Sequence, residues 1–170
     1  MIRNNKITLS VDCMGGDNSV DDIVGGVKQF CSENINDTLL LHGDKKALSR
    51  ALDKYPEIKK MCKIRHCDKV IQMGDKPSQS IRGGKNSSMW NSIESVKSSK
   101  AEVAISCGNT GSLMAISTLL LRKLPQVKRP AIAIFWPSTS NQGFNVVLDA
   151  GADIKAQPSD LLAYSNFGSD

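Results

Sequence analysis

Residues 104–114 read AISCGNTGSLM: a short apolar run, a turn of small residues, and a second apolar run. The apolar spacing predicts a strand over residues 102–106 and a helix over residues 111–124. The turn between them carries so little side-chain bulk that a ligand could approach the backbone. Free N–H groups and the helix dipole favour negative charge at a helix start. This stretch therefore predicts a strand–turn–helix unit with an anion site at its turn.

The same alternation of strand and helix patterns extends along the chain. Further strands are predicted at 6–12, 38–42, 63–65, 69–72, 131–135 and 145–148, and further helices at 20–33, directly after Asp44, at 88–98 and at 158–167. Residues 73–87 are predicted to form a long polar loop. This order indicates an α/β fold with a mainly parallel sheet and helices on both faces. In such sheets ligands bind beyond the carboxyl ends of the strands.

Composition narrows the classes of partner. The 170 residues carry a net charge of +5, and the basic residues are scattered. With two Trp, two Tyr and four Phe there is no aromatic platform for single-stranded nucleic acid, so no nucleic-acid partner is predicted. A weak positive field would favour an acidic protein or an anionic membrane surface. We find no secretory signal pattern and no membrane-length apolar run, which predicts a cytoplasmic protein.

Metal and nucleotide signatures do not emerge from the sequence. Cys62, His66 and Cys67 lie close together, but no second ligand pair completes a tetrahedral site, so the five cysteines are interpreted as reduced thiols. Cys107 is expected to be a small packing residue. Neither a G-x-G-x-x-G fingerprint nor a phosphate-binding P-loop motif is present. We therefore predict no metal and no cofactor.

Two glycine-containing turns are candidate anion sites. The first, VDCMGGD, places Asp12 at a strand end, followed by Gly15, Gly16 and Asp17. Paired glycines let amide groups converge on an oxyanion, although a plain tight turn explains them equally well. The second, SCGNTGS, contains Gly108, Asn109, Thr110 and Gly111. Here the polar side chains either cap the following helix or point at a ligand.

A third candidate combines cations and hydroxyls around the polar stretch. Such groups could clamp a phosphate through charge-assisted hydrogen bonds, and the alternative is a solvated loop. The residues are Lys76, Arg82, Lys85, Ser87 and Ser88. A fourth turn of the glycine type is predicted at Gly151, after Asp149 at another strand end.

Taken together, these segments resemble a known family. In order along the chain they are DCMGGD (12–17), Asp75-Lys76-Pro77, SSM (87–89), SCGNTG (106–111), RPAIA (129–133) and LDAGAD (148–153). The combination resembles the PlsX-type phosphate acyltransferases of bacterial phospholipid synthesis, from residue 7 to about residue 168. The resemblance implies a Rossmann-like three-layer α/β/α fold. It also implies transfer of a long-chain acyl group from acyl carrier protein to inorganic phosphate, which gives acyl phosphate.

The resemblance further implies a metal-free homodimer that associates peripherally with the membrane from the cytoplasm. Acyl carrier proteins are acidic, in keeping with the positive net charge. Two alternatives stay open: a coenzyme A-dependent enzyme of the phosphate acetyltransferase type, and a non-catalytic fragment. Family members are longer than this chain, so residues 1–170 are expected to be the N-terminal part of one catalytic domain. Alone, that part is expected to be inactive and prone to associate through an unpaired sheet edge.

Site roles follow from the resemblance and from the chemistry of acyl transfer. Phosphate attacks a thioester carbonyl through a tetrahedral oxyanion, which calls for hydrogen-bond donors and for no covalent nucleophile. Catalytic roles are predicted for Asn109, Thr110 and Lys76, and orienting roles for Asp12 and Asp149. Substrate or phosphate binding is predicted for Gly15, Gly16, Asp17, Arg82, Lys85, Ser87, Ser88, Gly108, Gly111 and Gly151.

Overall fold

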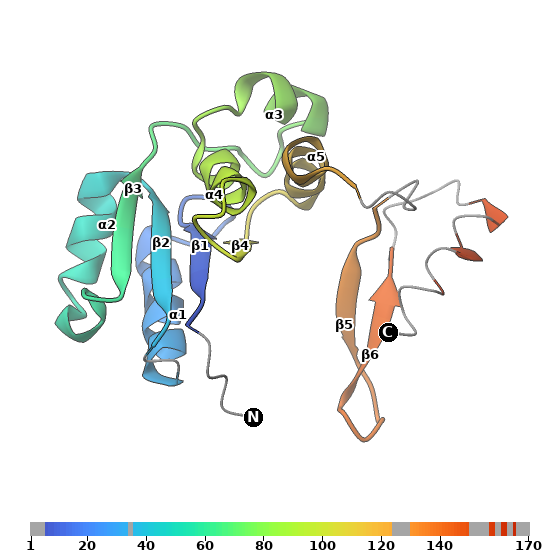
Figure 1. The fold of residues 1–170 in the computed structure, drawn as a ribbon, viewed down its shortest axis with the longest axis horizontal. Helices are drawn as coiled ribbons and strands as arrows, with labels where there is room; N and C mark the ends of the chain where they lie inside the picture. Colours follow the sequence, from blue (N-terminus) through green and yellow to red (C-terminus); the bar gives the residue numbers. More distant parts are fainter. Residues whose placement is uncertain are drawn as a thin grey trace. The chain divides into compact units, whose positions relative to one another are not determined.

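The computed structural model describes residues 6–33, 36–123, 130–149, 157, 158, 161, 162 and 165 (Figure 1). The chain divides into an N-terminal unit, residues 1–121, and a C-terminal unit, residues 122–170. Each unit is described by itself.

Four parallel strands form the sheet of the N-terminal unit. They are β1 (Thr8–Asp12), β2 (Thr38–Gly43), β3 (Cys62–His66) and β4 (Val103–Ser106), in the spatial order β3-β2-β1-β4. In register, Asp12 pairs with His42 on one side and with Ser106 on the other. The carboxyl ends of β1, β2 and β4 therefore meet at one edge of the sheet.

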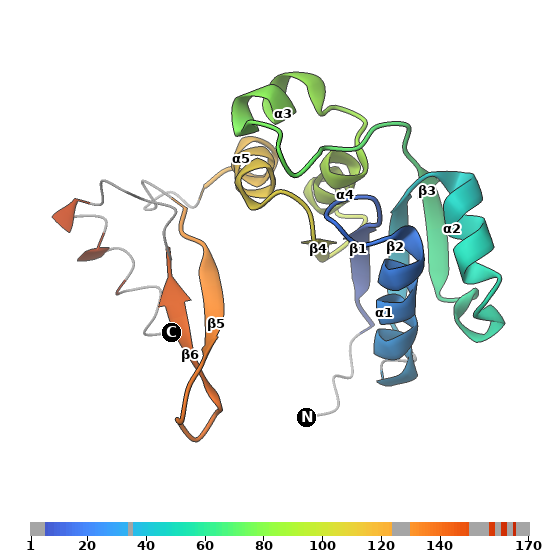
Figure 2. The same cartoon turned by 180° about the vertical axis from the view of Figure 1, so that it is seen from behind.

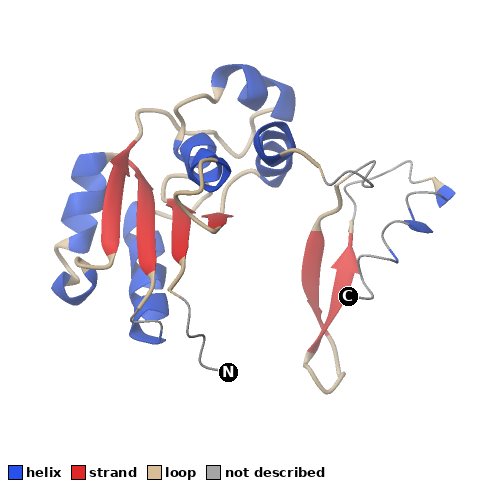
Figure 3. Ribbon diagram, viewed as in Figure 1, coloured by secondary structure: helices blue, strands red, loops and turns tan. Residues whose placement is uncertain are grey.

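Helices cover both faces of this sheet. They are α1 (Val20–Glu33), α2 (Lys45–Leu52), the short α3 (Pro77–Gly83), α4 (Ser88–Lys97) and α5 (Thr110–Leu121), with a 3-10 turn at Pro56–Ile58. Figures 1 and 2 show α1 and α2 on one face and α4 on the other, with α5 packed beside α4 and α3. The α/β fold with a mainly parallel sheet is confirmed, as the colouring by secondary structure makes plain (Figure 3).

Each face has its own apolar cluster. On the α1 side, Val24 and Val27 of α1 and Leu48 of α2 pack with Leu39 and Leu41 of β2. On the other side, apolar residues of α4 and α5 pack over the sheet; they include Met89, Ile93, Ile116 and Leu120. Burying a side chain of this size contributes roughly 1.5–3 kcal/mol. The two clusters hold the strands, and thus their carboxyl ends, in fixed positions.

Most predicted elements of the N-terminal unit appear close to their expected bounds. The helix over residues 20–33 has the predicted bounds, and Asp44 caps α2 because its Oδ1 accepts from the Ala47 amide at 2.8 Å. The strand predicted at 69–72 is wrong, since only Lys69 forms an isolated bridge, to Ser87. The predicted loop 73–87 contains α3, which starts at Pro77, a residue that is favourable in the first helical turn.

The C-terminal unit contains a hairpin of β5 (Ala133–Pro137) and β6 (Phe144–Leu148). The pair is antiparallel, in contrast to the largely parallel pairing predicted, because the short connection 138–143 cannot make a crossover. Of the helix predicted at 158–167, residues 158, 161, 162 and 165 are helical, and its other residues lie outside the described part. Within the described residues, we find no helix long and apolar enough to cross a membrane.

Candidate functional site

The two glycine turns touch each other at the carboxyl edge of the sheet. They follow β1 and β4, which are hydrogen-bonded neighbours. A Cβ atom placed on Gly15 would lie 3.2 Å from the Cα of Gly108, and one on Gly108 would lie 3.3 Å from the Cα of Gly15. A Cβ at either position would therefore crowd the backbone of the other turn.

Gly16 meets a second constraint. Its φ of +94° lies in the left-handed region, where side chains are strained. A Cβ there would also overlap the carbonyl oxygen of Cys107 and lie 3.0 Å from its carbonyl carbon. The glycines thus allow both the turn conformation and the contact between the turns.

A chain of hydrogen bonds joins the turns through the buried carboxylate of Asp12. Its Oδ1 accepts from the amides of Met14 (3.2 Å) and Gly15 (3.1 Å), and its Oδ2 accepts from the Ser106 hydroxyl at 2.7 Å. The Ser106 oxygen accepts in turn from the Gly108 amide at 3.0 Å. Asp12 is 1% exposed, so these donors replace its hydration. The carboxylate orders both turns from beneath.

The Asn109 side chain makes hydrogen bonds within the protein. Its Oδ1 accepts from the Ser112 amide at 2.9 Å, which caps α5, and its Nδ2 donates to the carbonyls of Met73 (2.7 Å) and Asp75 (3.0 Å). The side chain thereby ties the turn to the segment before α3. A direct role of Asn109 as a donor to substrate stays a prediction, and it would require these bonds to be exchanged.

The start of α5 has hydrogen-bond donors without an acceptor among the described residues. The amides of Thr110 and Gly111 have no acceptor among the described residues, and the Thr110 side chain is exposed and unbonded there. A Cβ on Gly111 would lie 3.0 Å from Cγ of Pro77, so α3 packs directly against this helix start. Two amides and one hydroxyl are therefore available to an anion.

The third candidate cluster is divided by burial. Lys76, Arg82 and Lys85 are exposed around α3 and make no ion pair with described residues. Ser87 is fully buried and caps α4, accepting from the Trp90 amide at 3.1 Å. Ser88 is also fully buried, and its hydroxyl has no partner in the described part of the chain. The cations face solvent while the hydroxyls belong to the core.

The remaining predicted residues differ in their surroundings, and one lies outside the described part. Asp149, with a φ of +58°, belongs to the C-terminal unit, where its amide donates to the Ile132 carbonyl. Asp17 is exposed, and Gly151 lies outside the described residues. Cys107 is exposed, in contrast to the expectation that it is a small packing residue. No group of three metal-ligating side chains occurs among the described residues.

An apolar pocket of about 380 Å³ opens beside the first turn, between α1 and β4. Its wall includes Ile23, Phe30 and Ile105, and it reaches Asp12 and Cys107. Ile105 is 40% exposed there, on β4, which lies at the edge of the four described strands. The site thus combines an anion-friendly turn with an adjoining apolar wall.

Comparison with known proteins places the chain in a family. The family model described as "Fatty acid synthesis protein" matches residues 7–170. A phosphate acyltransferase of Cereibacter sphaeroides (strain KD131) is 49% identical over 96% of this chain, and one of Paracoccus denitrificans is 47% identical over 95%. The chain belongs to the fatty acid synthesis protein family.

Relatives in this family are longer. The chain covers 44% of each of these two relatives, and so spans about half their length. A crystal structure of a phosphotransacetylase from Streptococcus pyogenes matches 96% of this family member and 53% of its own chain, with a TM-score of 0.70 at 13% identity. At that identity the likeness shows the fold alone, and it supports the Rossmann-like three-layer arrangement.

Ser106 is the residue that sequence reasoning missed. A serine at the end of a short apolar strand carries no signal of its own. The two neighbouring strands both end in a polar residue, Asp12 and Ser106, and these residues are paired in the sheet. That pairing is known only once the sheet register is known.

Proposed function

We propose that this family member transfers an acyl group to inorganic phosphate, with acyl carrier protein as the donor. The observation that carries the proposal is the contact between the two glycine turns beside the start of α5, where the Thr110 and Gly111 amides have no acceptor among the described residues. The names of its relatives, phosphate acyltransferases at 47–49% identity, support the same reaction.

In this mechanism, phosphate binds at the start of α5. Phosphate occurs as a mixture of monoanion and dianion near neutral pH and needs no strong base to act as a nucleophile. One of its oxygens attacks the thioester carbonyl, the C–O bond forms, and the C–S bond then breaks to release the thiolate, which takes up a proton from water. Amide donors stabilise the tetrahedral oxyanion, and loss of one such donor typically slows a reaction about 10²–10³-fold.

The buried Asp12–Ser106 pair has an orienting role in this proposal. Because the carboxylate holds amides of the first turn and the serine holds that of Gly108, neither turn needs to rearrange when charge develops. Preorganised donors of this kind are worth more than mobile ones. The exposed Lys76, Arg82 and Lys85 would attract the acidic carrier protein and its phosphate-bearing arm.

The apolar pocket between α1 and β4 supports a long acyl chain over an acetyl group. It begins at Asp12 and Cys107 and continues along apolar side chains. Gly26 of α1 lines it, and a Cβ on Gly26 would meet nothing within 4 Å. Gly26→Leu therefore adds bulk to the pocket without a clash in the backbone, whereas Gly26→Ala gives the same helix advantage with little bulk.

Activity is tested in two proteins: the 170-residue chain, and a fusion of it to the remaining half of the Paracoccus denitrificans relative. We expect the fusion to form acyl phosphate from long-chain acyl carrier protein, and Gly26→Leu, but not Gly26→Ala, to shift its preference to shorter chains. Faster turnover of acetyl-coenzyme A would favour the phosphate acetyltransferase type. An inactive fusion that folds and binds carrier protein would make the unit a binding module.

Further properties of the whole protein belong to the same proposal. We infer that residues 1–170 form the N-terminal part of one catalytic domain, and that the complete enzyme acts as a homodimer on the cytoplasmic membrane surface. The positive net charge supports contact with an anionic surface. Sedimentation of the fusion, with and without vesicles containing anionic lipid, tests both parts: a monomer that ignores vesicles would contradict them.

A further inference from the structure

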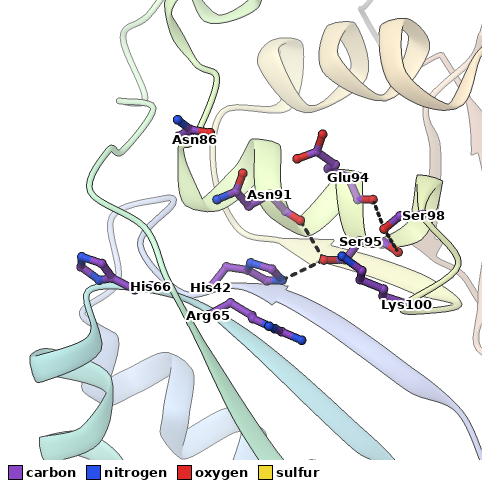
Figure 4. A pocket seen from close by; sticks show the side chains of 9 residues that line it. All are labelled: His42, Arg65, His66, Asn86, Asn91, Glu94, Ser95, Ser98 and Lys100. Carbon is purple, nitrogen blue, oxygen red and sulfur yellow. Dashed lines mark hydrogen bonds between the residues drawn. The ribbon is translucent and has the colours of Figure 1, made fainter.

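A polar pocket of about 610 Å³ lies between β3 and α4, on the sheet face opposite α1 (Figure 4). It shares no lining residue with the two glycine turns. Its wall includes His42 from the end of β2, Arg65 from β3, Asn86, Asn91 and Ser95 around α4, and Lys100.

His42 is the buried polar group of this pocket, with 2% of its surface exposed. Its Nε2 lies 2.9 Å from the Ser10 hydroxyl and 3.3 Å from the Ser95 hydroxyl. Its Nδ1 is buried and has no partner among the described residues. A buried nitrogen without a partner is unfavourable, so a ligand that pairs with it is favoured over one that does not.

The charge around His42 is positive. Arg65 and Lys100 make no ion pair with described residues, and both side chains line the pocket beneath Ser95 (Figure 4). His66 is already engaged, with its Nε2 2.8 Å from Asp68. The Glu94 carboxylate turns away from the His42–Ser95 bond in Figure 4. The pocket therefore offers two cations to an anion.

The His42 ring is neutral at pH 7. Burial, with Arg65 as the second cause, lowers its pKa to about 4, against a small opposing effect of Asp12. A neutral imidazole has two tautomers. If Nε2 carries the proton, Nδ1 is an acceptor; if Nδ1 carries it, Nδ1 is a donor. The Ser95 hydroxyl donates to the Asn91 carbonyl at 2.9 Å and so accepts from Nε2, which makes Nδ1 the acceptor of the ring. A ligand with an acidic hydroxyl beside charged oxygens can donate to Nδ1 and bind the cations, whereas a ligand without a proton cannot donate to Nδ1.

We propose that this pocket binds a phosphate group, free or as a monoester, through Arg65 and Lys100, with the Nδ1 atom of His42 paired to one phosphate oxygen. A phosphate that retains one proton offers both a donor and acceptors, while sulfate and simple carboxylates offer acceptors only. The guanidinium fork suits two phosphate oxygens at once. This goes beyond the proposed function, since it is a second anion site on a different pair of strands.

Histidine NMR tests the proposal directly, because the chain contains two histidines in all. We would titrate the ¹⁵N-labelled 170-residue chain with inorganic phosphate, methyl phosphate and sulfate at about pH 6, where roughly half of a phosphate monoester still carries its proton. The expected result is a saturable shift of the His42 Nδ1 signal with both phosphates. Whichever phosphate binds more tightly identifies the source as free phosphate or monoester. Sulfate should bind at least about tenfold more weakly.

Matched variants separate a site from charge screening. Arg65→Gln and Lys100→Gln change exposed residues and should each weaken phosphate binding about tenfold. Lys63→Gln removes the same charge two residues earlier on the same face of β3, outside the pocket lining, and should leave binding unchanged. Equal weakening by Lys63→Gln, or equal binding of sulfate, would overturn the proposal.

The same titration keeps the two anion sites apart. Shifts of the Thr110 and Gly111 amides report the site of the proposed function, and the His42 signal reports this pocket. Amide shifts with a silent His42 would reject the second site alone. A His42 shift with silent amides would reject the phosphate site at the glycine turns alone.

Discussion

Two neighbouring parts of one sheet edge solve the problem of buried polar groups in different ways. At the ends of β1 and β4, Asp12 is satisfied by donors from its own and the neighbouring turn. At the end of β2, His42 has a satisfied Nε2 but an unpaired Nδ1. The first arrangement is a closed network that leaves only helix-start amides open. The second leaves a ring nitrogen open among cations. Satisfied networks build scaffolds, and unsatisfied groups indicate where a partner would fit.

The largest expected effect comes from breaking the contact between the glycine turns. Gly16→Ala forces a side chain into a left-handed conformation, at a cost of about 1–3 kcal/mol, and a methyl group into the Cys107 carbonyl, at a similar cost. We expect the free energy of unfolding to fall by about 4 kcal/mol in chemical denaturation. Gly26→Ala, in open space on α1, should raise it slightly. Equal stability of the two variants would show that the turns tolerate separation.

The next effect is the pH dependence of stability that arises from His42 at the end of β2. The pKa of His42 is lowered to about 4 in the folded chain, from 6.5 in the unfolded chain. The unfolded chain therefore binds the extra proton first as pH falls. The contribution of His42 to the free energy of unfolding is fully present above pH 6.5. It is lost as the pH falls toward 4, by about 3 kcal/mol in all.

Thermal unfolding at pH values from 7 to 4 measures this loss. In His42→Gln the slope of stability against pH should flatten in that window, and in His66→Gln it should persist. A wild-type chain whose stability does not change between pH 6.5 and 4.5 would contradict the buried, neutral state of His42.

The third effect removes the link inside the closed network. Ser106→Ala deletes a donor to buried Asp12 and the acceptor of the Gly108 amide. Leaving such groups unpaired costs about 2 kcal/mol. We expect that loss in unfolding experiments, together with slower acyl-phosphate formation by the fusion protein. Ser98→Ala, which removes an exposed hydroxyl at the C-cap of α4, is the control; it should lower stability less than Ser106→Ala and leave activity unchanged. Normal activity of a destabilised Ser106→Ala protein would limit the serine to a structural role.

Sequence reasoning reached the scaffold more completely than the site. Short apolar runs identified the central parallel strands, which are buried on both faces, and period-3.6 patterns identified the helices over 20–33 and 88–98, of which α1 and α4 are the observed counterparts. It missed α3, whose residues PSQSIRG have almost no apolar periodicity. It also missed the antiparallel pairing of β5 and β6, which follows from loop length more than from strand composition.

At the site, glycines in the sequence indicated the turns, because Gly16 has a positive φ and a Cβ on Gly15 or Gly108 would crowd the other turn. Hydrogen-bond partners could not be predicted in the same way. Ser106 depends on sheet register, and the segment that Asn109 contacts lies more than thirty positions earlier in the chain. The unpaired nitrogen of His42 was also out of reach, since only the packing of α4 against β2 buries that ring.

The smallest expected effect on stability distinguishes capping from catalysis at the start of α5. The Asn109 side chain caps the helix and holds the Met73 and Asp75 carbonyls, so Asn109→Ala should lower the free energy of unfolding by about 1 kcal/mol. The Thr110 side chain makes no bond in the described chain, so Thr110→Ala should leave stability unchanged. If both residues contribute to oxyanion or phosphate binding, each variant of the fusion protein should still form acyl phosphate about 10²–10³-fold more slowly. Unfolding curves and initial rates on the same preparations decide between these roles.

Full activity of Thr110→Ala would mean that the backbone amides are the donors at this turn. Full activity of a destabilised Asn109→Ala would mean that Asn109 only caps the helix.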